Sequence, residues 1–394
     1  MKNLYYILVV FIPLIFLFTS CDKTEISSTQ AESFVKHFGG SGADLASNVV
    51  QLSDGGFAII GSIETSNKGY EIYLMRTDKY GNLKWEPQQW GGTLDDKGYD
   101  LSLDSDDNLI LLGSVEDTTT FGDIERDARL IKVNDSDGST LWTQDIGSEL
   151  DEEACDLLIN QDGSYIIGGY SNNGTDKDIW ISKIQNDSIR SKKYGSIGTT
   201  EEIKSLVEIS ENGGFLAIGN SISGSEYNIQ PMLFNSDLNY IGGEIYKRNG
   251  SDEAGNLLNS NNSYITISSS KNASNNSIVL LSIVSITNDF PQITPFKDIE
   301  SQEAEIYGNS ICSLSTGGYA IVGSAITAGN EDIYLLITDS QGNVVNSNTF
   351  GGTGTQVGLQ IQQTSDGGFI ILGLNTFDNN SMITLIKTKP DGSL

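Results

Sequence analysis

The sequence SDGGFAIIG at residues 53–61 joins a tight-turn signal to a short apolar run that ends in glycine. The Asp-Gly-Gly segment favours a hairpin turn, and the aromatic-led run favours a buried strand. Copies of this run recur along the chain: Phe57–Gly61, Leu109–Gly113, Tyr165–Gly169, Phe215–Gly219, Tyr264–Ser268, Tyr319–Gly323 and Phe369–Gly373. Successive copies begin 49 to 56 residues apart, so the chain is a repeat protein with a period near 50.

Each repeat unit has room for four short strands. In the first unit we expect strands over residues 45–52, 57–63, 71–76 and 83–90, separated by polar or glycine-containing turns. No segment of the unit has helical periodicity, and this pattern is typical of a β-propeller blade. The sequence therefore predicts an all-β protein, a seven-bladed β-propeller with four-stranded antiparallel blades. The fifth unit, around residues 249–296, is the most divergent, because Ser268 stands where the other units have glycine.

The two ends of the repeat region are complementary. The seventh unit runs from Gly351 to Leu394 and stops before a fourth strand, whereas the segment Phe34–Gly40 resembles a fourth strand without the first three. We therefore expect residues 33–38 to pair with the last unit and complete its blade. This pairing closes the ring and removes two exposed sheet edges.

Residues 1–20 have the features of an export signal. Lys2 precedes an apolar run of 15 residues, Leu4–Phe18, which is shorter than the about 20 residues that a membrane-spanning helix needs. The segment Leu17–Cys21 resembles the cleavage box of bacterial lipoproteins, in which the cysteine becomes lipidated. The alternative is ordinary signal cleavage, in which Cys21 has no role.

A polar segment follows the predicted signal. Residues 21–32 contain no apolar periodicity and predict a flexible tether, so we expect the propeller to span residues 33–394. A lipidated Cys21 carries more than one acyl chain, and two or more chains anchor a protein stably in a membrane.

The charge balance restricts the partners of the protein. The chain has 52 acidic and 23 basic residues, which gives a formal net charge of −29. Such a surface repels phosphate backbones, so we expect no nucleic-acid binding. The single histidine, His37, excludes a multi-histidine metal site, and we expect no catalytic role for it. We expect Cys155 and Cys312 to be buried free thiols, although an exported protein can form a disulfide.

Two segments carry a resemblance to a known family. Residues 351–373 and residues 332–343, with their GG and SDGGFIILG motifs, resemble the β-propeller repeats of secreted and surface proteins of Bacteroidota. The resemblance covers about residues 33–394 and implies the propeller fold. The family is functionally mixed, so the resemblance implies no catalytic residue.

An acidic residue lies 13 positions before the leading residue of most runs, or one position from that spacing. At the start of the innermost strands, such residues would ring one mouth of the central channel: Asp44, Asp96, Glu152, Glu202, Asp252 and Glu305. Gln356 holds this position in the seventh unit. Because hard cations take oxygen ligands, the ring is a candidate site for Ca²⁺ or a cationic ligand. The alternative, which we favour, is that each carboxylate caps backbone N–H groups of its own loop.

Two other groups of residues have structural interpretations. The aspartate-rich segments 104–108 and 135–139 lack the glutamate of a calcium loop and are expected as hairpin turns. A group of aromatic residues near strand ends is expected to pack between blades rather than to stack on sugars: Trp85, Trp90, Trp142, Tyr194 and Phe350.

These observations predict a monomeric cell-envelope lipoprotein, anchored by lipid to the outer membrane. Its propeller is expected to act as a non-enzymatic binding or scaffolding module for protein or glycan ligands, without a cofactor other than the candidate Ca²⁺. The alternative is a glycan-active hydrolase or lyase that uses paired carboxylates. Convergent carboxylates in one cleft would favour the enzyme, and a patch without them would favour the binder.

Overall fold

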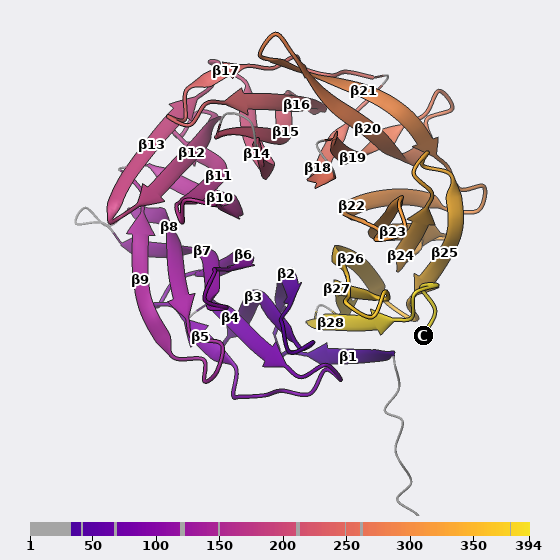
Figure 1. Cartoon of the computed structure of the whole chain (residues 1–394), viewed down its shortest axis with the longest axis horizontal. Helices are drawn as coiled ribbons and strands as arrows, with labels where there is room; N and C mark the ends of the chain where they lie inside the picture. The colour runs from indigo at the N-terminus through magenta and orange to yellow at the C-terminus, as the bar shows by residue number, and fades with distance from the viewer. Residues whose placement is uncertain are drawn as a thin grey trace, which may run out of the picture. The chain divides into compact units, whose positions relative to one another are not determined.

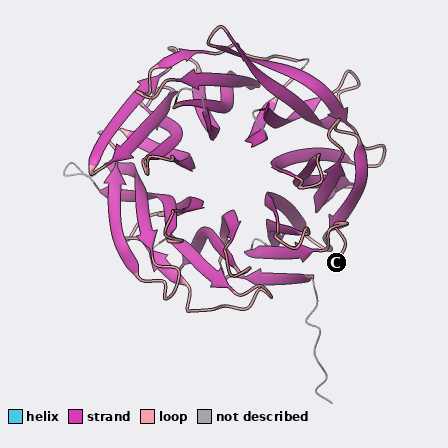
Figure 2. Cartoon of the chain, in the orientation of Figure 1, coloured by secondary structure: helices cyan, strands magenta, loops and turns pink. Residues whose placement is uncertain are grey.

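The structure, a computed structural model, describes residues 33–394 apart from 41, 67–68, 119–122, 149, 210–212, 249, 261–262 and 379. The predicted signal peptide, Cys21 and the tether lie outside the described residues. Residues Ala31–Leu394 form one compact unit. Its described residues are built from strands and turns (Figure 2). The described segments include no helix long and apolar enough to cross a membrane.

Five four-stranded antiparallel sheets follow one another along the chain, each in sequence order from the innermost strand outward. The first two sheets consist of β2 (Leu45–Gln51), β3 (Phe57–Thr65), β4 (Gly69–Thr77) and β5 (Gln88–Trp90), and of β6 (Lys97–Leu103), β7 (Leu109–Thr118), β8 (Ile124–Val133) and β9 (Thr140–Ile146). The next sheet consists of β10 (Asp151–Ile159), β11 (Tyr165–Asn172), β12 (Lys177–Gln185) and β13 (Ser188–Tyr194). The last two consist of β14 (Thr200–Ile209), β15 (Gly214–Ser223), β16 (Glu226–Phe234) and β17 (Tyr240–Gly242), and of β18 (Glu253–Ser260), β19 (Ser263–Lys271), β20 (Ser277–Thr287) and β21 (Phe290–Ile299).

The remaining strands form one eight-stranded sheet. Its first half consists of β22 (Glu305–Ser313), β23 (Tyr319–Thr327), β24 (Asn330–Thr338) and β25 (Val344–Phe350), and its second of β26 (Thr355–Gln363), β27 (Phe369–Phe377), β28 (Asn380–Thr388) and β1 (Phe34–Phe38). A single parallel bridge between Glu331 and Thr355 joins the two halves. The 28 strands of the described chain therefore fit sheets of four throughout.

The sheets of the compact unit are arranged in a ring with their first strands innermost (Figure 1). Consecutive innermost strands contact one another, and β26 contacts β2, which closes the series. The predicted pairing of the N-terminal segment is confirmed, because β1 pairs antiparallel with β28 from Phe34–Lys387 to Phe38–Ile383. The first and last parts of the repeat region thus share one sheet, and Phe34 packs into a core with Ile59 and Leu385.

The glycine that ends six of the seven apolar runs is required by a β-bulge. Every pairing of an innermost strand with its neighbour contains a register shift near this position. The bulge brings the backbone of the innermost strand against the glycine: a Cβ at Gly219 would lie 1.8 Å from the Glu202 carbonyl oxygen, and one at Gly323 would lie 1.9 Å from that of Tyr307. Only glycine leaves room for this approach.

The divergent fifth unit keeps the bulge by a different arrangement. Ser268 stands in β19 at the usual glycine position, and the register of β18 shifts between Ala254 and Leu257. Gly255 lies in this shifted segment, and a Cβ there would be 2.9 Å from the Ile267 side chain. The close approach is thus accommodated by a glycine on the innermost strand instead.

The first unit departs from expectation in its fourth strand. We expected a strand over residues 83–90, but β5 covers only Gln88–Trp90, with an isolated bridge between Thr77 and Leu83. Pro87 explains the interruption, because proline cannot donate a ladder hydrogen bond.

The hydrophobic core lies between adjacent sheets. Ile60 and Leu74 of one sheet pack with Leu111 and Val133 of the next, and similar clusters recur around the ring. The predicted packing role of the strand-end aromatic residues is confirmed, because all of them pack against such clusters: Trp85, Trp90, Trp142, Tyr194 and Phe350.

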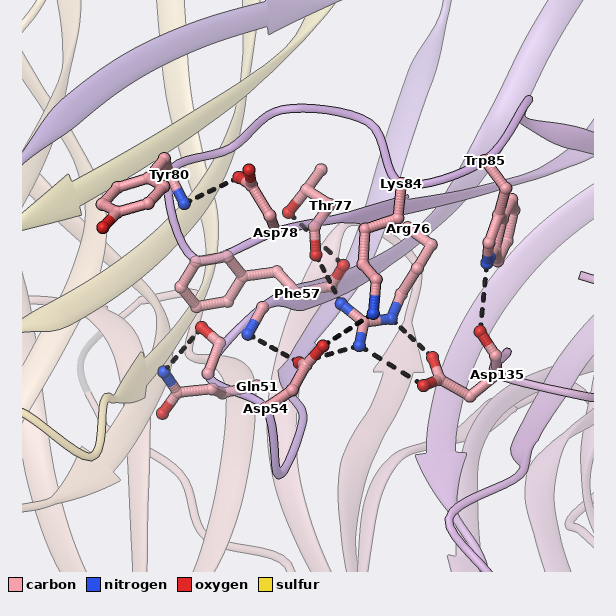
Figure 3. Close-up of polar contacts among 12 residues, drawn as sticks. Gln51, Asp54, Phe57, Arg76, Thr77, Asp78, Tyr80, Lys84, Trp85 and Asp135 are labelled. Atoms are coloured by element: carbon pink, nitrogen blue, oxygen red, sulfur yellow. Dashed lines mark hydrogen bonds and ion pairs between the residues drawn. The ribbon is translucent and has the colours of Figure 1, made fainter. Parts of the chain in front are cut away.

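A buried arginine ties the first two sheets together (Figure 3). The side chain of Arg76 is fully buried at the end of β4, and it donates to Asp54 at 2.8 Å and to Asp135 at 2.5 Å. Asp54 belongs to the β2–β3 turn of the same sheet, whereas Asp135 follows β8 in the next one. Lys84 makes a second, exposed contact with Asp54 at 2.8 Å.

We predict that Arg76→Leu lowers the free energy of unfolding by about 2–4 kcal/mol, because it removes the buried donor of the partly buried Asp135 and one donor of the exposed Asp54. Lys84→Ala removes the exposed contact to the same carboxylate and should cost less than about 1 kcal/mol. Urea unfolding of both variants measures the difference. Equal losses would contradict the role assigned to Arg76.

Candidate functional site

The predicted ring carboxylates are engaged by their own loops. Asp44 accepts hydrogen bonds from Gly40 N at 2.7 Å and Glu64 N at 3.2 Å, and Asp96 makes the equivalent contacts with Gly92 N and Glu116 N. Burial raises the pKa of both carboxyls. These contacts hold the start of each innermost strand against the loop before it, as the loop-cap interpretation expects.

Two other ring members make the same kind of cap, and the last two do not. Glu152 and Asp252 accept from the backbone N–H four residues earlier, at 2.9 and 2.8 Å. Glu202 instead contacts Lys204 Nζ at 3.1 Å and Asn220 Nδ2 at 3.1 Å. Glu305 is exposed and accepts from Ser277 Oγ at 2.9 Å. In the described ranges, no group of three or more His, Cys, Asp or Glu residues could hold a metal ion, and cation binding at this ring stays a prediction.

The strand registers show why Glu202 and Glu305 differ. The buried position occupied by Asp44, Asp96, Glu152 and Asp252 lies two residues before the bulge. In β14 that position holds Glu201, and in β22 it holds Ile306. Counting from the apolar run cannot detect this shift, because the length of the turn between the first two strands varies among units.

The residue after each buried position lies on the opposite face of its strand, because side chains alternate along a strand. In five of the seven units this residue is polar, and the sequence analysis singled out only Glu202 among the five: Lys97, Glu153, Glu202, Glu253 and Tyr307. Glu253 is exposed, and the half-buried Lys204 lies close enough to interact with both Glu202 and Glu253.

A cavity of about 240 Å³ opens beside the innermost strands β18, β22 and β26, and we call it the inner cavity. Glu253 of β18 and Glu331 of β24 line it together with Tyr307 of β22. Ser324 Oγ donates a hydrogen bond of 2.7 Å to Glu331 Oε1. The bridge between Glu331 and Thr355 holds this carboxylate at the junction of β24 and β26. Two carboxylates from consecutive sheets thus line one cavity, which the linear pattern did not reveal.

Tyr307 extends the polar network beyond the inner cavity. Its hydroxyl donates to Glu305 Oε2 at 3.1 Å and lies within hydrogen-bond distance of Ser277 Oγ, at 2.9 Å. Asn309 and Ser269 add an amide and a hydroxyl to the lining. Such groups can orient a polyhydroxylated ligand, because each donates and accepts hydrogen bonds.

A second carboxyl pair lies at the bulges of β6 and β10. Asp100 accepts from Asn48 of β2 and, at 2.8 Å, from Leu157 N of β10. Asp156 accepts from Leu206 N of β14 at 2.5 Å. Each side chain therefore satisfies a backbone N–H on the next innermost strand, where the bulge interrupts the ladder.

Asp100 and Asp156 also contact each other, and they share the pH behaviour of a coupled pair. Burial raises the pKa of both carboxyls, and the charge of Asp100 raises that of Asp156 further. Two ionised carboxylates in contact repel strongly, so the folded protein retains a proton here that two separate carboxyls would release. This contact is shorter than the separation of about 5–9 Å that glycosidase carboxyl pairs need. We therefore assign the pair to the fold and not to catalysis.

The remaining sequence candidates have structural roles. Cys155 and Cys312 are free thiols, and burial raises the pKa of each to about 12. His37 Nδ1 lies 3.0 Å from Thr384 Oγ1 in the closing strand pair. In the turn after β6, Asp104 caps Asp106 N and Asn108 N at 2.9 Å each, as expected for a hairpin turn.

Comparisons with known proteins agree with the fold. No family model and no curated relative matches the chain. A periplasmic gluconolactonase of Pseudomonas aeruginosa matches with a TM-score of 0.55 at 10% identity, over 85% of this chain and 97% of that one. An ulvan lyase of a new polysaccharide lyase family matches with 0.52 at 8% identity, over 91% and 97%. Raptor of Chaetomium thermophilum matches with 0.56 at 12% identity, over 90% and 28%.

At these identities the likeness shows the fold, an all-β architecture of the β-propeller type. It also corrects the prediction that the protein is not an enzyme. A gluconolactonase and a polysaccharide lyase both use a fold of this kind. The repeat architecture was our ground for a purely binding role, and it gives none, because the same rigid frame can hold converging catalytic groups.

We predict that Asp156→Asn flattens the pH dependence of stability. Wild type binds more protons folded than unfolded above the ordinary aspartate pKa of 3.8, so its stability falls as the pH rises. The introduced amide can donate to an ionised Asp100, so the variant needs no shared proton. Its stability relative to wild type should therefore increase with pH, by up to about 1.4 kcal/mol per pH unit.

Urea unfolding between about pH 5 and about pH 8 measures this difference. Other carboxyls with raised pKa values, such as Asp127 at about 6, contribute equally to both proteins and cancel. Asp106→Asn, in an exposed turn, is the matched control. Parallel stability curves for wild type and Asp156→Asn would contradict the shared proton.

We also predict that Ca²⁺ and Mg²⁺ raise the melting temperature equally at the same concentration and ionic strength, because screening of the net charge is their common effect. Asp96→Asn should lower the free energy of unfolding by about 1–3 kcal/mol, since it weakens two backbone caps. Thermal melts with and without chelator provide the measurement. A shift specific to Ca²⁺ that disappears in Asp96→Asn would show that the ring is a cation site.

Proposed function

We propose that the protein is a glycan-active hydrolase whose catalytic carboxyl pair is Glu253 and Glu331. The observation that carries this proposal is the convergence of these two carboxylates in the inner cavity. Cleavage of a glycosidic bond needs one carboxyl group as general acid and a second as base or nucleophile. The hydrogen bond from Ser324 fixes the position of Glu331 Oε1 beside the inner cavity, which suits Glu331 to the second role.

The size and lining of the inner cavity support a sugar ligand. Its volume of about 240 Å³ lies below the range of about 300–1,000 Å³ for sites that enclose a drug-sized molecule. We therefore propose that it holds one sugar unit while the rest of the glycan lies outside. Asn309, whose Nδ2 donates to Gly358 O, would accept hydrogen bonds from its hydroxyl groups through Oδ1. The similar folds of a gluconolactonase and a polysaccharide lyase add weak support.

We propose that the fold has seven blades and that the enzyme works at the cell envelope. The 28 strands in sheets of four and the completion of the last sheet by β1 support the blade count. The export signal, Cys21 and the polar tether support a monomeric lipoprotein of the Bacteroidota type, attached to the outer membrane by its lipid. Its partners would then be the membrane and a glycan substrate, without nucleic acid.

We predict that Glu331→Gln and Glu253→Gln each lower the rate of glycan cleavage at least about 100-fold, because each removes a proton donor or acceptor. The assay measures reducing-end release from a panel of neutral and uronic-acid-containing polysaccharides. Glu303→Gln, an exposed change in the loop before β22, is the matched control and should retain full activity.

Three outcomes would contradict the proposal. One is a wild type that releases no sugar from any polysaccharide of the panel, and another is a pair of variants that cleave as fast as wild type. Products that end in an unsaturated uronate would show a lyase instead of a hydrolase.

A further inference from the structure

One position of the repeat changes character halfway around the ring. In each sheet the second and third strands pair with each other, and this position is the next-to-last residue of the third strand in that pairing. In β4 it is Arg76. Its counterparts Lys132, Lys183 and Lys387 each contact the aspartate of the neighbouring hairpin turn, at 2.6, 3.4 and 2.9 Å. In the three sheets that begin with β14, β18 and β22, the same position holds Leu233, Ile283 and Ile337.

The first two of these exchanges border a cavity of about 720 Å³, which we call the β16–β20 groove. Leu233 of β16 and Ile283 of β20 lie on its two sides. Ile283 is 40% exposed and Ile241 of β17 is 44% exposed, so apolar surface remains in contact with solvent there. Further apolar side chains complete the lining: Ile209, Phe234, Tyr264, Val284 and Ile286.

The groove is open because the edge strand on one side is short and the hairpin on the other side is long. Ile229 of β16 exchanges two backbone hydrogen bonds with Tyr246, so Pro231, two residues on, faces the same side without an N–H. The edge strand β17 covers only Tyr240–Gly242, and Glu244 N donates to Pro291 O of β21 instead. On the opposite wall, β20 and β21 form the longest hairpin of the described chain, with 11 and 10 residues.

The lining of the groove disfavours an anionic ligand. Among the described residues that line the groove there is no Lys, Arg or His, and Asp289 is the one acidic residue. Burial of an anion without a cationic partner is costly, and the net charge of −29 repels anions as well. Asn235, Asn288 and Ser285 offer neutral hydrogen-bonding groups beside the apolar surface. The groove volume lies within the range for drug-sized ligands.

We propose that the β16–β20 groove binds a small, uncharged and largely apolar molecule. The site is independent of the glycan site, because it shares no lining residue with the inner cavity. The basic residue of the other sheets would place a charge in this space. Its replacement by Leu233 and Ile283 therefore converts a structural ion-pair position into a ligand pocket.

The test is a fluorescence titration of the mature protein with the uncharged probe N-phenyl-naphthylamine. We expect one bound probe per chain. Ile283→Lys should weaken binding at least about tenfold, because it introduces a charge into the apolar groove. Ile283 is 40% exposed, so the lysine can be accommodated at the groove surface. Ile189→Lys is the matched control: Ile189 of β13 is 42% exposed and lies outside the groove, so this variant should bind as wild type does.

A second variant covers the case in which Ile283→Lys does not fold. Ile241→Gln changes an exposed side chain of the lining, so it should fold and also weaken the probe. Three binding results would overturn the proposal: no probe binding by wild type, equal binding by the groove variants and wild type, and tighter binding of the anionic probe anilinonaphthalene sulfonate. A fourth result would also overturn it: sedimentation that shows a self-associated wild type and a monomeric Ile283→Lys, since a second copy of the chain would then be the occupant.

Discussion

The contact between a bulged innermost strand and a glycine of the next strand is the constraint on which the structure depends. At Gly219 and Gly323 the carbonyl oxygen of the bulged strand occupies the space that a Cβ would need. The bulge increases the local twist of the sheet near the centre, where the sheets are closest to one another. The glycine therefore recurs about every 50 residues because the units repeat this backbone contact. Where Ser268 replaces the glycine, Gly255 on the opposite strand restores the space.

The chemistry of the inner surface follows from the same bulges. Each bulge interrupts the hydrogen-bond ladder and leaves N–H groups that Asp100 and Asp156 satisfy from the preceding strand. It also fixes which side chains lie on each face of the innermost strand. Asp96 therefore becomes a buried cap, whereas Glu253, one position further along the repeat, is exposed and lines the inner cavity. Buried carboxyls with shared protons and exposed carboxyls available to a ligand thus coexist within a few residues of each other.

The two cavities on which our proposals rest both border the divergent fifth unit. Glu253, Gly255 and Ser269 of this unit line the inner cavity, and Ile283 and Ile286 line the β16–β20 groove. In a symmetric ring every interface between sheets is equivalent, so a distinct site needs a local departure from the repeat. The displacement of the glycine to Gly255 and the replacement of the basic residue by Ile283 in β20 are such departures. A repeat fold can thus confine function to one sector while the other sheets retain the stabilising pattern.

Sequence alone determined the repeat, the all-β class and the complementary ends, because these depend on short-range patterns: turn glycines, apolar runs and where the units start and stop. It also indicated correctly that Trp142 and Phe350 pack between sheets. Only the tertiary structure decided which acidic residues come together. Glu253 and Glu331 lie 78 positions apart and on different sheets, and they line one cavity because the ring brings β18 beside β22 and β24 beside β26. A register shift of one residue places Glu201 at the buried cap position and Glu202 on the opposite face of β14, because side chains alternate along a strand and each turn length sets that alternation anew.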